Sequence, residues 1–208
     1  MKILQPTVFV IDDDDAVRSS VRLLFKSVNL PVAVFASAEE FLPRYVQDQP
    51  GCLIVDVRMA GMSGLELQQQ LNLRGAIIPV ILVTGHGDIP MAVEAMQHGA
   101  LDFLTKPFRD QDLLDRVQVA LQKDAENHRE LADLERYRAC LASLTPRERE
   151  VLELVSSGKP NKVMAADLGV SQRTVEIHRS RVMEKMQARS LAQLVRVSLD
   201  LGIGRLHV

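Results

Sequence analysis

The sequence predicts an α/β domain built on a parallel sheet, followed by a smaller all-α domain. Short apolar runs rich in β-branched residues alternate with helical segments through the first half of the 208 residues. These runs are apolar throughout, as strands buried on both faces are. Strand-like runs then disappear, and helical patterns continue toward the C-terminus. A repeating strand and helix order predicts a parallel sheet covered by helices on both faces.

Five strands are expected in the first domain, with helices between them. The helix over 16–28 has its apolar residues on one face, and a helix over 37–45 opens with a capping-box pattern of Ser37 and Glu40. The strands are expected at 7–11, 32–35, 52–55, 79–83 and 101–104.

The segment from 110 to about 141 is charge-rich, with apolar residues at spacings of three or four. We predict one long helix that ends the first domain and serves as a linker. Its apolar stripe has two interpretations, which are pairing with a second chain and packing partly on its own domain. A helix is then predicted to begin at the capping pattern of Thr145, Pro146 and Glu148. Four short helices are expected at 146–157, 160–168, 172–187 and 190–201, and the domains at 1–121, 122–140 (the linker) and 141–208.

The composition and charge exclude several classes of protein. With 47% hydrophobic and 25% charged residues, the chain is neither disordered, nor collagen, nor a disulfide-rich miniprotein. The distant Cys52 and Cys140 lack metal-binding spacing, which favours a reduced, cytoplasmic chain without a membrane segment or signal peptide. Residues 1–121 hold 10 Lys and Arg against 15 Asp and Glu, whereas residues 141–208 hold 11 against 7. An acidic module is therefore joined to a basic one, although the whole chain carries only −2.

Polar side chains follow four of the five predicted strands, at the edge where doubly wound sheets bind ligands. Asp12 and Asp13 follow the first strand, Asp56 the third, Thr84 the fourth and Lys106 the fifth. Crowded carboxylates repel one another, and Mg²⁺ with its oxygen ligands relieves that repulsion. A carboxylate beside Mg²⁺, with a hydroxyl and an ammonium for developing charge, suits attack on phosphorus. We therefore expect a site that forms an acyl phosphate on an aspartate.

Each of these residues alone has a plainer interpretation. The run of acids after the first strand could be an ordinary helix N-terminus, Lys106 a surface lysine and Thr84 a strand-end hydroxyl bound to backbone. Their joint placement at four strand ends favours the phosphoryl site. No P-loop, zinc signature or nucleophile elbow occurs, which disfavours a metabolic enzyme.

Four motifs in the first domain resemble the receiver domain of two-component response regulators. The resemblance covers residues 5–121, and the stretch 84–96 is especially similar to the FixJ branch of the NarL/LuxR-type regulators. It implies a flavodoxin-like (βα)5 receiver fold. The motifs are VIDDD at 10–14, LIVDVRM at 53–59, VTGHGD at 83–88 and FLTKPF at 103–108.

The resemblance implies a role for each site residue. Asp56 is the expected phospho-acceptor, Lys106 and Thr84 are expected to contact the phosphoryl group, and Phe103 is the expected switch residue that turns inward when Thr84 moves. As a plainer alternative, an aromatic residue in a strand is often simply part of the core. Mg²⁺ is expected on Asp12, Asp13, Asp56 and the backbone carbonyl of Arg58.

Two details of the loops concern this family pattern. Ala60 stands where the family usually has proline, so the loop after Asp56 loses a φ constraint and gains an N–H. We expect this to alter the stiffness of the loop rather than abolish phosphorylation. The family also has a cis peptide bond at the position of Lys106 and Pro107.

The second domain has the layout of a helix-turn-helix. A helix over 160–168, a turn at Gly169 and an N-cap at Ser171 precede a longer helix from residue 172. On that helix Val175, Val182 and Met186 share the inward face, and the outward residues are Glu176, Ile177, Ser180, Arg181 and Glu184.

The motifs of this domain resemble the LuxR-type DNA-binding domain over residues 142–201. They are LTPREREVL at 144–152, PNK at 160–162, LGVS at 168–171 and TVEIH at 174–178. The resemblance makes 172–187 the recognition helix, with Glu176, Ile177 and Ser180 toward base edges. Contacts near phosphates are expected from Lys162, Arg173, Thr174, Arg179 and Lys185, although any single basic residue could instead belong to a solvated face.

Together the resemblances imply a transcriptional regulator that is not a conventional enzyme, because its receiver catalyses only its own phosphorylation and dephosphorylation. The implied partners are a sensor histidine kinase, double-stranded promoter DNA, RNA polymerase and a second copy of the chain on phosphorylation. A haloacid-dehalogenase-type phosphatase is disfavoured because the nucleophile follows the third strand and no cap domain exists. A phosphorylation-independent regulator with a receiver-like docking domain is the main alternative. RNA antitermination is disfavoured because the turn and its N-cap suit duplex DNA.

Overall fold

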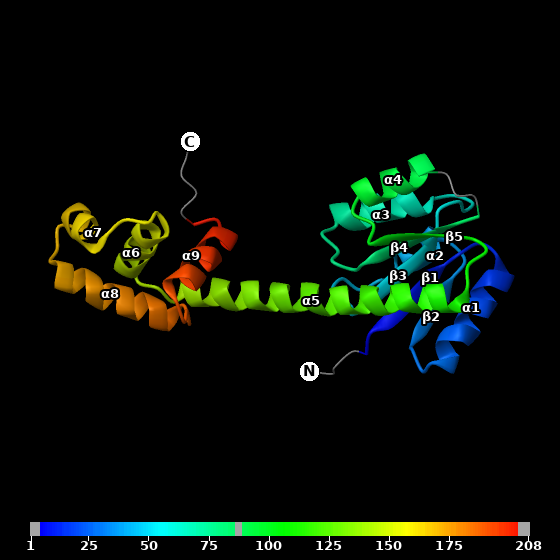
Figure 1. Cartoon of the computed structure of the whole chain (residues 1–208), viewed down its shortest axis with the longest axis horizontal. Helices are drawn as coiled ribbons and strands as arrows, with labels where there is room; N and C mark the ends of the chain where they lie inside the picture. The colour runs from blue at the N-terminus through cyan, green and yellow to red at the C-terminus, as the bar shows by residue number, and fades with distance from the viewer. Residues whose placement is uncertain (1–4, 86–88, 204–208) are drawn as a thin grey trace. The chain divides into compact units, whose positions relative to one another are not determined.

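The computed structural model describes residues 5–85 and 89–203, which form two compact units. The first unit ends at His128 and the second begins at Arg129, inside one continuous helix, α5 (Asp110–Ala142). Figure 1 labels the helices and strands of both units. Within the described residues, no helix combines the length and the apolar character that crossing a membrane requires.

The first unit contains the predicted parallel sheet. Its order is β2-β1-β3-β4-β5, and every neighbouring pair is parallel. The third and fourth strands extend to Asp56 and Thr84, because both residues pair within the sheet. The predicted strands ended one residue earlier. The strands are β1 (Thr7–Ile11), β2 (Val32–Phe35), β3 (Gly51–Asp56), β4 (Val80–Thr84) and β5 (Asp102–Thr105).

Two apolar cores lie on opposite faces of this sheet because successive side chains of a strand point to opposite sides. Phe9 and Leu53 pack with residues of α2 (Ala38–Phe41), α3 (Gly64–Leu73) and α4 (Ile89–Gln97). Val10 and Ile54 pack with residues of α1 (Asp15–Ser27) and α5. The alternation explains why these strands are apolar at every position, as the sequence predicted.

The helix predicted over 37–45 is wrong in length, since α2 ends at Phe41. Ser37 caps it by accepting from the Glu40 N–H, but the Glu40 carboxylate accepts from the N–H of Ala36, so the capping box is not closed. Pro43 lies two residues beyond this end and supplies no N–H for the helical ladder, which explains the early end.

The second unit contains the end of α5 and the four predicted short helices, which share an apolar core. Val151, Met164, Val175 and Val182 are buried in it, and Thr145 forms the predicted capping box at its first helix. The helices are α6 (Pro146–Ser156), α7 (Asn161–Leu168), α8 (Gln172–Lys185) and α9 (Leu191–Asp200).

Polar contacts hold α5 to the first unit beyond residue 121. The carboxylate of Asp124, whose residue is 2% exposed, accepts from the Gly51 N–H at 2.9 Å. The two ring nitrogens of His128 each lie 2.9 Å from a carbonyl oxygen, of Asp124 and of Asp48. Only an imidazolium donates from both nitrogens. Burial acts against that charge, but the carbonyl contacts and the two carboxylates raise the pKa of His128.

We predict that His128→Gln destabilises the first unit more at pH 6 than at pH 9. The pKa of His128 is raised in the folded state, so its contribution is complete below the ordinary value of about 6.5 and is lost as the pH rises through the folded pKa. We expect a difference of about 0.5–1 kcal/mol at pH 6, from urea unfolding of the full chain.

His98→Gln is the matched control because His98 contacts one carbonyl, of Glu94, through one ring nitrogen. It should show a smaller change with pH. A His128→Gln effect of equal size at both pH values would contradict the charged state of this side chain.

Candidate functional site

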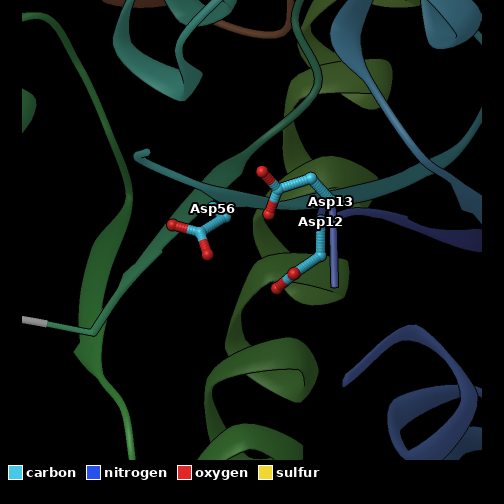
Figure 2. Close-up of side chains that lie close together, drawn as sticks. All are labelled: Asp12, Asp13 and Asp56. Atoms are coloured by element: carbon cyan, nitrogen blue, oxygen red, sulfur yellow. The ribbon is translucent and has the colours of Figure 1, made fainter. Parts of the chain in front are cut away.

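Three carboxylates meet at the carboxyl ends of two neighbouring strands. Asp12 and Asp13 follow β1, Asp56 ends β3, and one oxygen of each lies within 4.8 Å of the others (Figure 2). Asp12 is 3% exposed and Asp56 is 8% exposed, whereas Asp13 is open to solvent. The parallel pairing of β1 with β3 brings these residues together from positions 44 apart in the chain.

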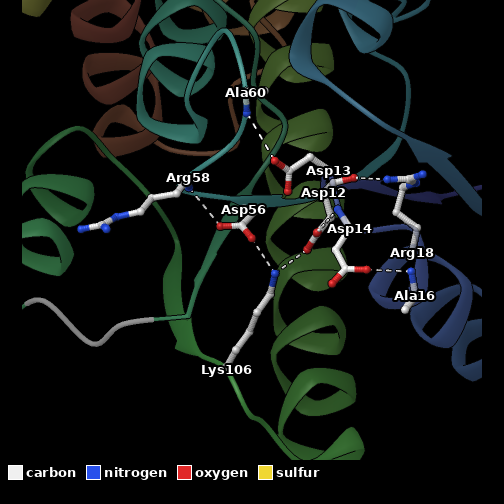
Figure 3. A network of polar contacts seen from close by, with 9 residues as sticks. All are labelled: Asp12, Asp13, Asp14, Ala16, Arg18, Asp56, Arg58, Ala60 and Lys106. Carbon is white, nitrogen blue, oxygen red and sulfur yellow. Dashed lines mark hydrogen bonds and ion pairs between the residues drawn. The ribbon is translucent and has the colours of Figure 1, made fainter.

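Lys106 joins two of these carboxylates from the end of β5. Its Nζ lies 2.6 Å from Asp12 Oδ2 and 2.5 Å from Asp56 Oδ2 (Figure 3). Burial raises the pKa of Asp12, although the ammonium opposes that shift. Burial also acts against the charge of Lys106, but its hydrogen bonds to Asp12 and Asp56 raise its pKa. The ammonium therefore neutralises part of the charge of a pocket that desolvates its acids.

Backbone groups orient the same carboxylates. Asp12 Oδ1 accepts from the Asp14 N–H at 2.9 Å, and Asp56 Oδ1 accepts from the Arg58 N–H at 3.0 Å. Asp14 also caps α1, so the positive end of that helix begins beside the pocket. Arg18 was not among the predicted site residues, yet its Nη1 donates to the Asp12 carbonyl at 2.6 Å. A basic residue one turn into the helix was the available signal.

Thr84 is the last residue of β4, one position beyond the predicted strand, and Phe103 lies in β5. Thr84 is fully buried, and its carbonyl accepts from the Lys106 N–H at 2.7 Å. Phe103 is half-buried and packs against the core that includes α3 and α4. The peptide bond between Lys106 and Pro107 is cis, as the family resemblance predicted. The motif residues 86–88 lie outside the described residues.

The donor set suits a hard divalent cation. All three clustered side chains offer carboxylate oxygens, which Mg²⁺ prefers, and one ammonium leaves excess negative charge among them. Asp12, Asp13 and Asp56 could therefore hold Mg²⁺, together with the Arg58 carbonyl that the resemblance implies. Such an ion would supply positive charge beside a phosphoryl oxygen.

The second candidate site is the helix-turn-helix of α7 and α8. Gly169 ends α7 with a φ of +65°, a left-handed conformation that suits glycine, and Ser171 caps α8 by accepting from the Thr174 N–H at 3.1 Å. The outward positions predicted for α8 are exposed, and Ile177 is 47% exposed. Exposed apolar and polar groups on one helix face suit contact with base edges.

Several of the predicted phosphate contacts have partners within this unit. Lys185 Nζ lies 2.7 Å from the buried carboxylate of Glu148, and this hydrogen bond is the main reason that the pKa of Glu148 is lowered to about 2. Arg179 donates to the Asn161 side chain, and the Thr174 hydroxyl lies 2.8 Å from that of Ser171. The side chains of Lys162 and Arg173 are exposed and form no hydrogen bond or ion pair within residues 5–85 and 89–203. The sequence pattern did not reveal these internal pairings.

Comparison with known families explains both sites. Residues 8–118 match the response regulator receiver domain, and residues 142–198 match the bacterial regulatory proteins of the luxR family. This chain is a response regulator of the NarL/FixJ type. Such response regulators combine a receiver, whose acidic pocket binds Mg²⁺, with a LuxR-type DNA-binding domain, and the family is generally not enzymatic.

Relatives match this response regulator along nearly its whole length. Nodulation protein W of Bradyrhizobium diazoefficiens is 48% identical over 96% of this chain and 88% of its own. The transcriptional regulatory protein FixJ of Azorhizobium caulinodans is 50% identical over 94% and 93%. Among solved structures, response regulator StyR aligns with a TM-score of 0.76 and 44% identity over 94% and 99% of the two chains. Full-length FixJ from B. japonicum aligns with a TM-score of 0.56 and 40% identity over 95% and 97%.

We predict that Lys106→Met lowers the free energy of unfolding of the receiver by about 1–3 kcal/mol at pH 7, because it leaves buried carboxylates unpaired. Adding Mg²⁺ should recover part of the loss, because the ion restores positive charge to the pocket. Urea unfolding with and without Mg²⁺ measures both effects.

Lys123→Met is the control, because Lys123 forms an exposed pair with Glu126 at 3.6 Å. We expect that variant to lose less than about 0.5 kcal/mol. Equal losses for the two variants would show that the pocket does not depend on the Lys106 ammonium.

Proposed function

We propose that this response regulator takes a phosphoryl group from a sensor histidine kinase onto Asp56, dimerises and regulates transcription by sequence-specific binding to promoter DNA. The observation that supports the phosphoryl step best is the position of Lys106, which bonds the Asp56 and Asp12 carboxylates at the end of the sheet. An ammonium at that point meets a phosphoryl group as soon as it is attached to Asp56.

The transfer needs a nucleophile and compensation for charge. An Asp56 oxygen attacks the phosphorus of the kinase phosphohistidine, an O–P bond forms, and the P–N bond breaks with its electron pair returning to the imidazole. Lys106 neutralises charge on the phosphoryl oxygens, and the Thr84 hydroxyl donates a hydrogen bond to one of them. Asp12, Asp13, Asp56 and the Arg58 carbonyl would hold Mg²⁺, which would supply further positive charge. The acyl phosphate is later cleaved by water, which restores the Asp56 carboxylate, so the receiver catalyses only its own turnover.

The new group changes the surface of the receiver. A phosphoryl group adds nearly two negative charges beside Thr84 and Lys106. Thr84 moves toward it and Phe103 turns inward, which remodels the face of α4 and β5. Val93 and Met96 of α4 are each 50% exposed and lie on the helix of this face. We propose that this face then joins two copies of the chain.

Dimerisation is what makes the DNA contact effective. One small helix-turn-helix makes few phosphate contacts, and two linked modules gain from their effective concentration on paired half-sites. Glu176, Ile177 and Ser180 face base edges. The residues that lie near phosphates or position the helix are Lys162, Arg173, Thr174 and Arg179. Lys185 can contact a phosphate only if its ammonium leaves the Glu148 carboxylate.

The remaining elements of the proposal follow from the family. RNA polymerase is the partner at the promoter, and the protein works in the cytoplasm without a membrane. We propose a receiver at 1–121, a linker at 122–140 and a DNA-binding domain at 141–208. The contacts of Asp124 and His128 add the first turns of that linker to the packing of the receiver.

We predict that incubation with acetyl phosphate and Mg²⁺ adds about 80 Da, one phosphoryl group, to the wild-type chain and nothing to Asp56→Asn. Intact mass measures the adduct, and sizing of the same samples measures dimerisation. No adduct on the wild type would favour the alternative, a phosphorylation-independent DNA-binding regulator. Unchanged promoter activity in cells that carry Asp56→Asn would also favour this phosphorylation-independent alternative.

We predict that Arg173→Gln reduces the salt dependence of DNA binding by about one phosphate contact, a change of about 0.9 in the slope of log K against log salt concentration. Lys185→Gln should change that slope much less, because Glu148 already holds the Lys185 ammonium. Binding to a promoter fragment at several salt concentrations measures both slopes. Equal changes for both variants would contradict this assignment of the basic residues.

A further inference from the structure

The loop between β3 and α3 is held to its surroundings by three backbone N–H groups. The Arg58 N–H donates to Asp56 Oδ1 at 3.0 Å, and the Ala60 N–H donates to Asp13 Oδ2 at 3.3 Å. The Met62 N–H donates to Glu39 Oε1, on α2, at 2.9 Å. One short loop thus contacts two of the clustered carboxylates and a neighbouring helix.

Asp13 is the least constrained of the three clustered carboxylates. Lys106 and a backbone N–H each hold Asp12 and Asp56, and both of those residues are buried. Asp13 is exposed and forms no ion pair within the described part of the chain. Its one hydrogen-bond donor among those residues is the Ala60 N–H, as Figure 3 shows.

We propose that the Ala60 N–H is a positioning group that orients Asp13 for the divalent cation, an inference that rests on the proposed function. The same loop offers the ion the Arg58 carbonyl, two residues before Ala60. Fixing Asp13 to this loop therefore fixes the separation of two oxygen ligands before the ion arrives. A ligand set that is arranged in advance binds more tightly because less order has to be created on binding.

The position of the Ala60 N–H is itself determined by the loop that follows. Gly61 has a φ of +80°, and a Cβ there would lie 2.7 Å from Glu39 Oε1, so the chain passes close to that carboxylate. Glu39 in turn accepts from Met62. Ser63 and Glu66 then close a capping box that starts α3. The loop is thus held on both sides of Ala60.

This arrangement requires a backbone N–H at position 60, which alanine has and proline lacks. The family pattern usually has proline at position 60, so proline is compatible with the path of the loop. In this chain a hydrogen bond to Asp13 replaces the stiffness that proline provides. Ala60→Pro is therefore a variant that removes the donor and keeps a backbone the fold accepts.

The test measures Mn²⁺ binding to the full chain by electron paramagnetic resonance, with Mn²⁺ as a probe that shares the oxygen preference of Mg²⁺. We expect Ala60→Pro to bind Mn²⁺ about three- to tenfold more weakly than the wild type, the effect of one hydrogen bond. Ala60→Gly keeps the N–H and should stay within about twofold. Circular dichroism checks that both variants are folded.

A double-variant comparison separates positioning of Asp13 from a general change in the loop. If Ala60 acts through Asp13, then Ala60→Pro has no further effect on Mn²⁺ binding in an Asp13→Ala background, which lacks the acceptor oxygen. Wild-type affinity in Ala60→Pro, or the same loss in both backgrounds, would overturn the role of Ala60. A wild-type chain that binds no Mn²⁺ would overturn the proposed metal site and this inference with it.

Discussion

The contact between the Lys106 ammonium and the carboxylates of Asp12 and Asp56 is the constraint around which the receiver is arranged. Two acids that are 3% and 8% exposed lie next to each other, and a third adjoins them. Without a nearby cation this arrangement would be strongly unfavourable, because burial and mutual repulsion both oppose ionised carboxylates. Lys106 lowers the energetic cost of the buried carboxylates in the folded chain, but its single positive charge does not neutralise all three of them. That shortage of positive charge suits the pocket to a divalent cation and, in the proposed function, to a phosphoryl group that Lys106 would contact.

The topology of the sheet explains why these groups meet. In the order β2-β1-β3-β4-β5 the chain leaves β1 toward one edge and returns on the other side to form β3. In doubly wound sheets ligands bind outside the strand ends at such a reversal of strand order. Asp12 and Asp56 lie at those two ends, and Lys106 reaches them from the end of β5. The chemistry therefore depends on strand order as much as on residue type.

This dependence shows which features a sequence can predict. The strands and the residues at their ends were predictable, because an apolar run followed by a polar residue is a local signal that the sheet then repeats at one edge. Pairings over long distances were not. The bonds of Ala60 to Asp13, of His128 to Asp48 and of Lys185 to Glu148 join residues that no periodicity relates. The prediction of a helix over 37–45 was wrong in length for a local reason. It gave more weight to the capping pattern than to the proline at position 43.

One helix contributes side chains to the cores of both units. Leu113 and Val117 of α5 are fully buried in the receiver, whereas Tyr137 and Leu141 of the same helix pack in the core of the DNA-binding unit. Packed residues resist displacement, so burial fixes each end of α5 to its own unit. The polar contacts of Asp124 and His128 extend the hold of the receiver on this helix beyond its apolar contacts. The receiver and the DNA-binding unit therefore each depend on a part of the same helix for their packing.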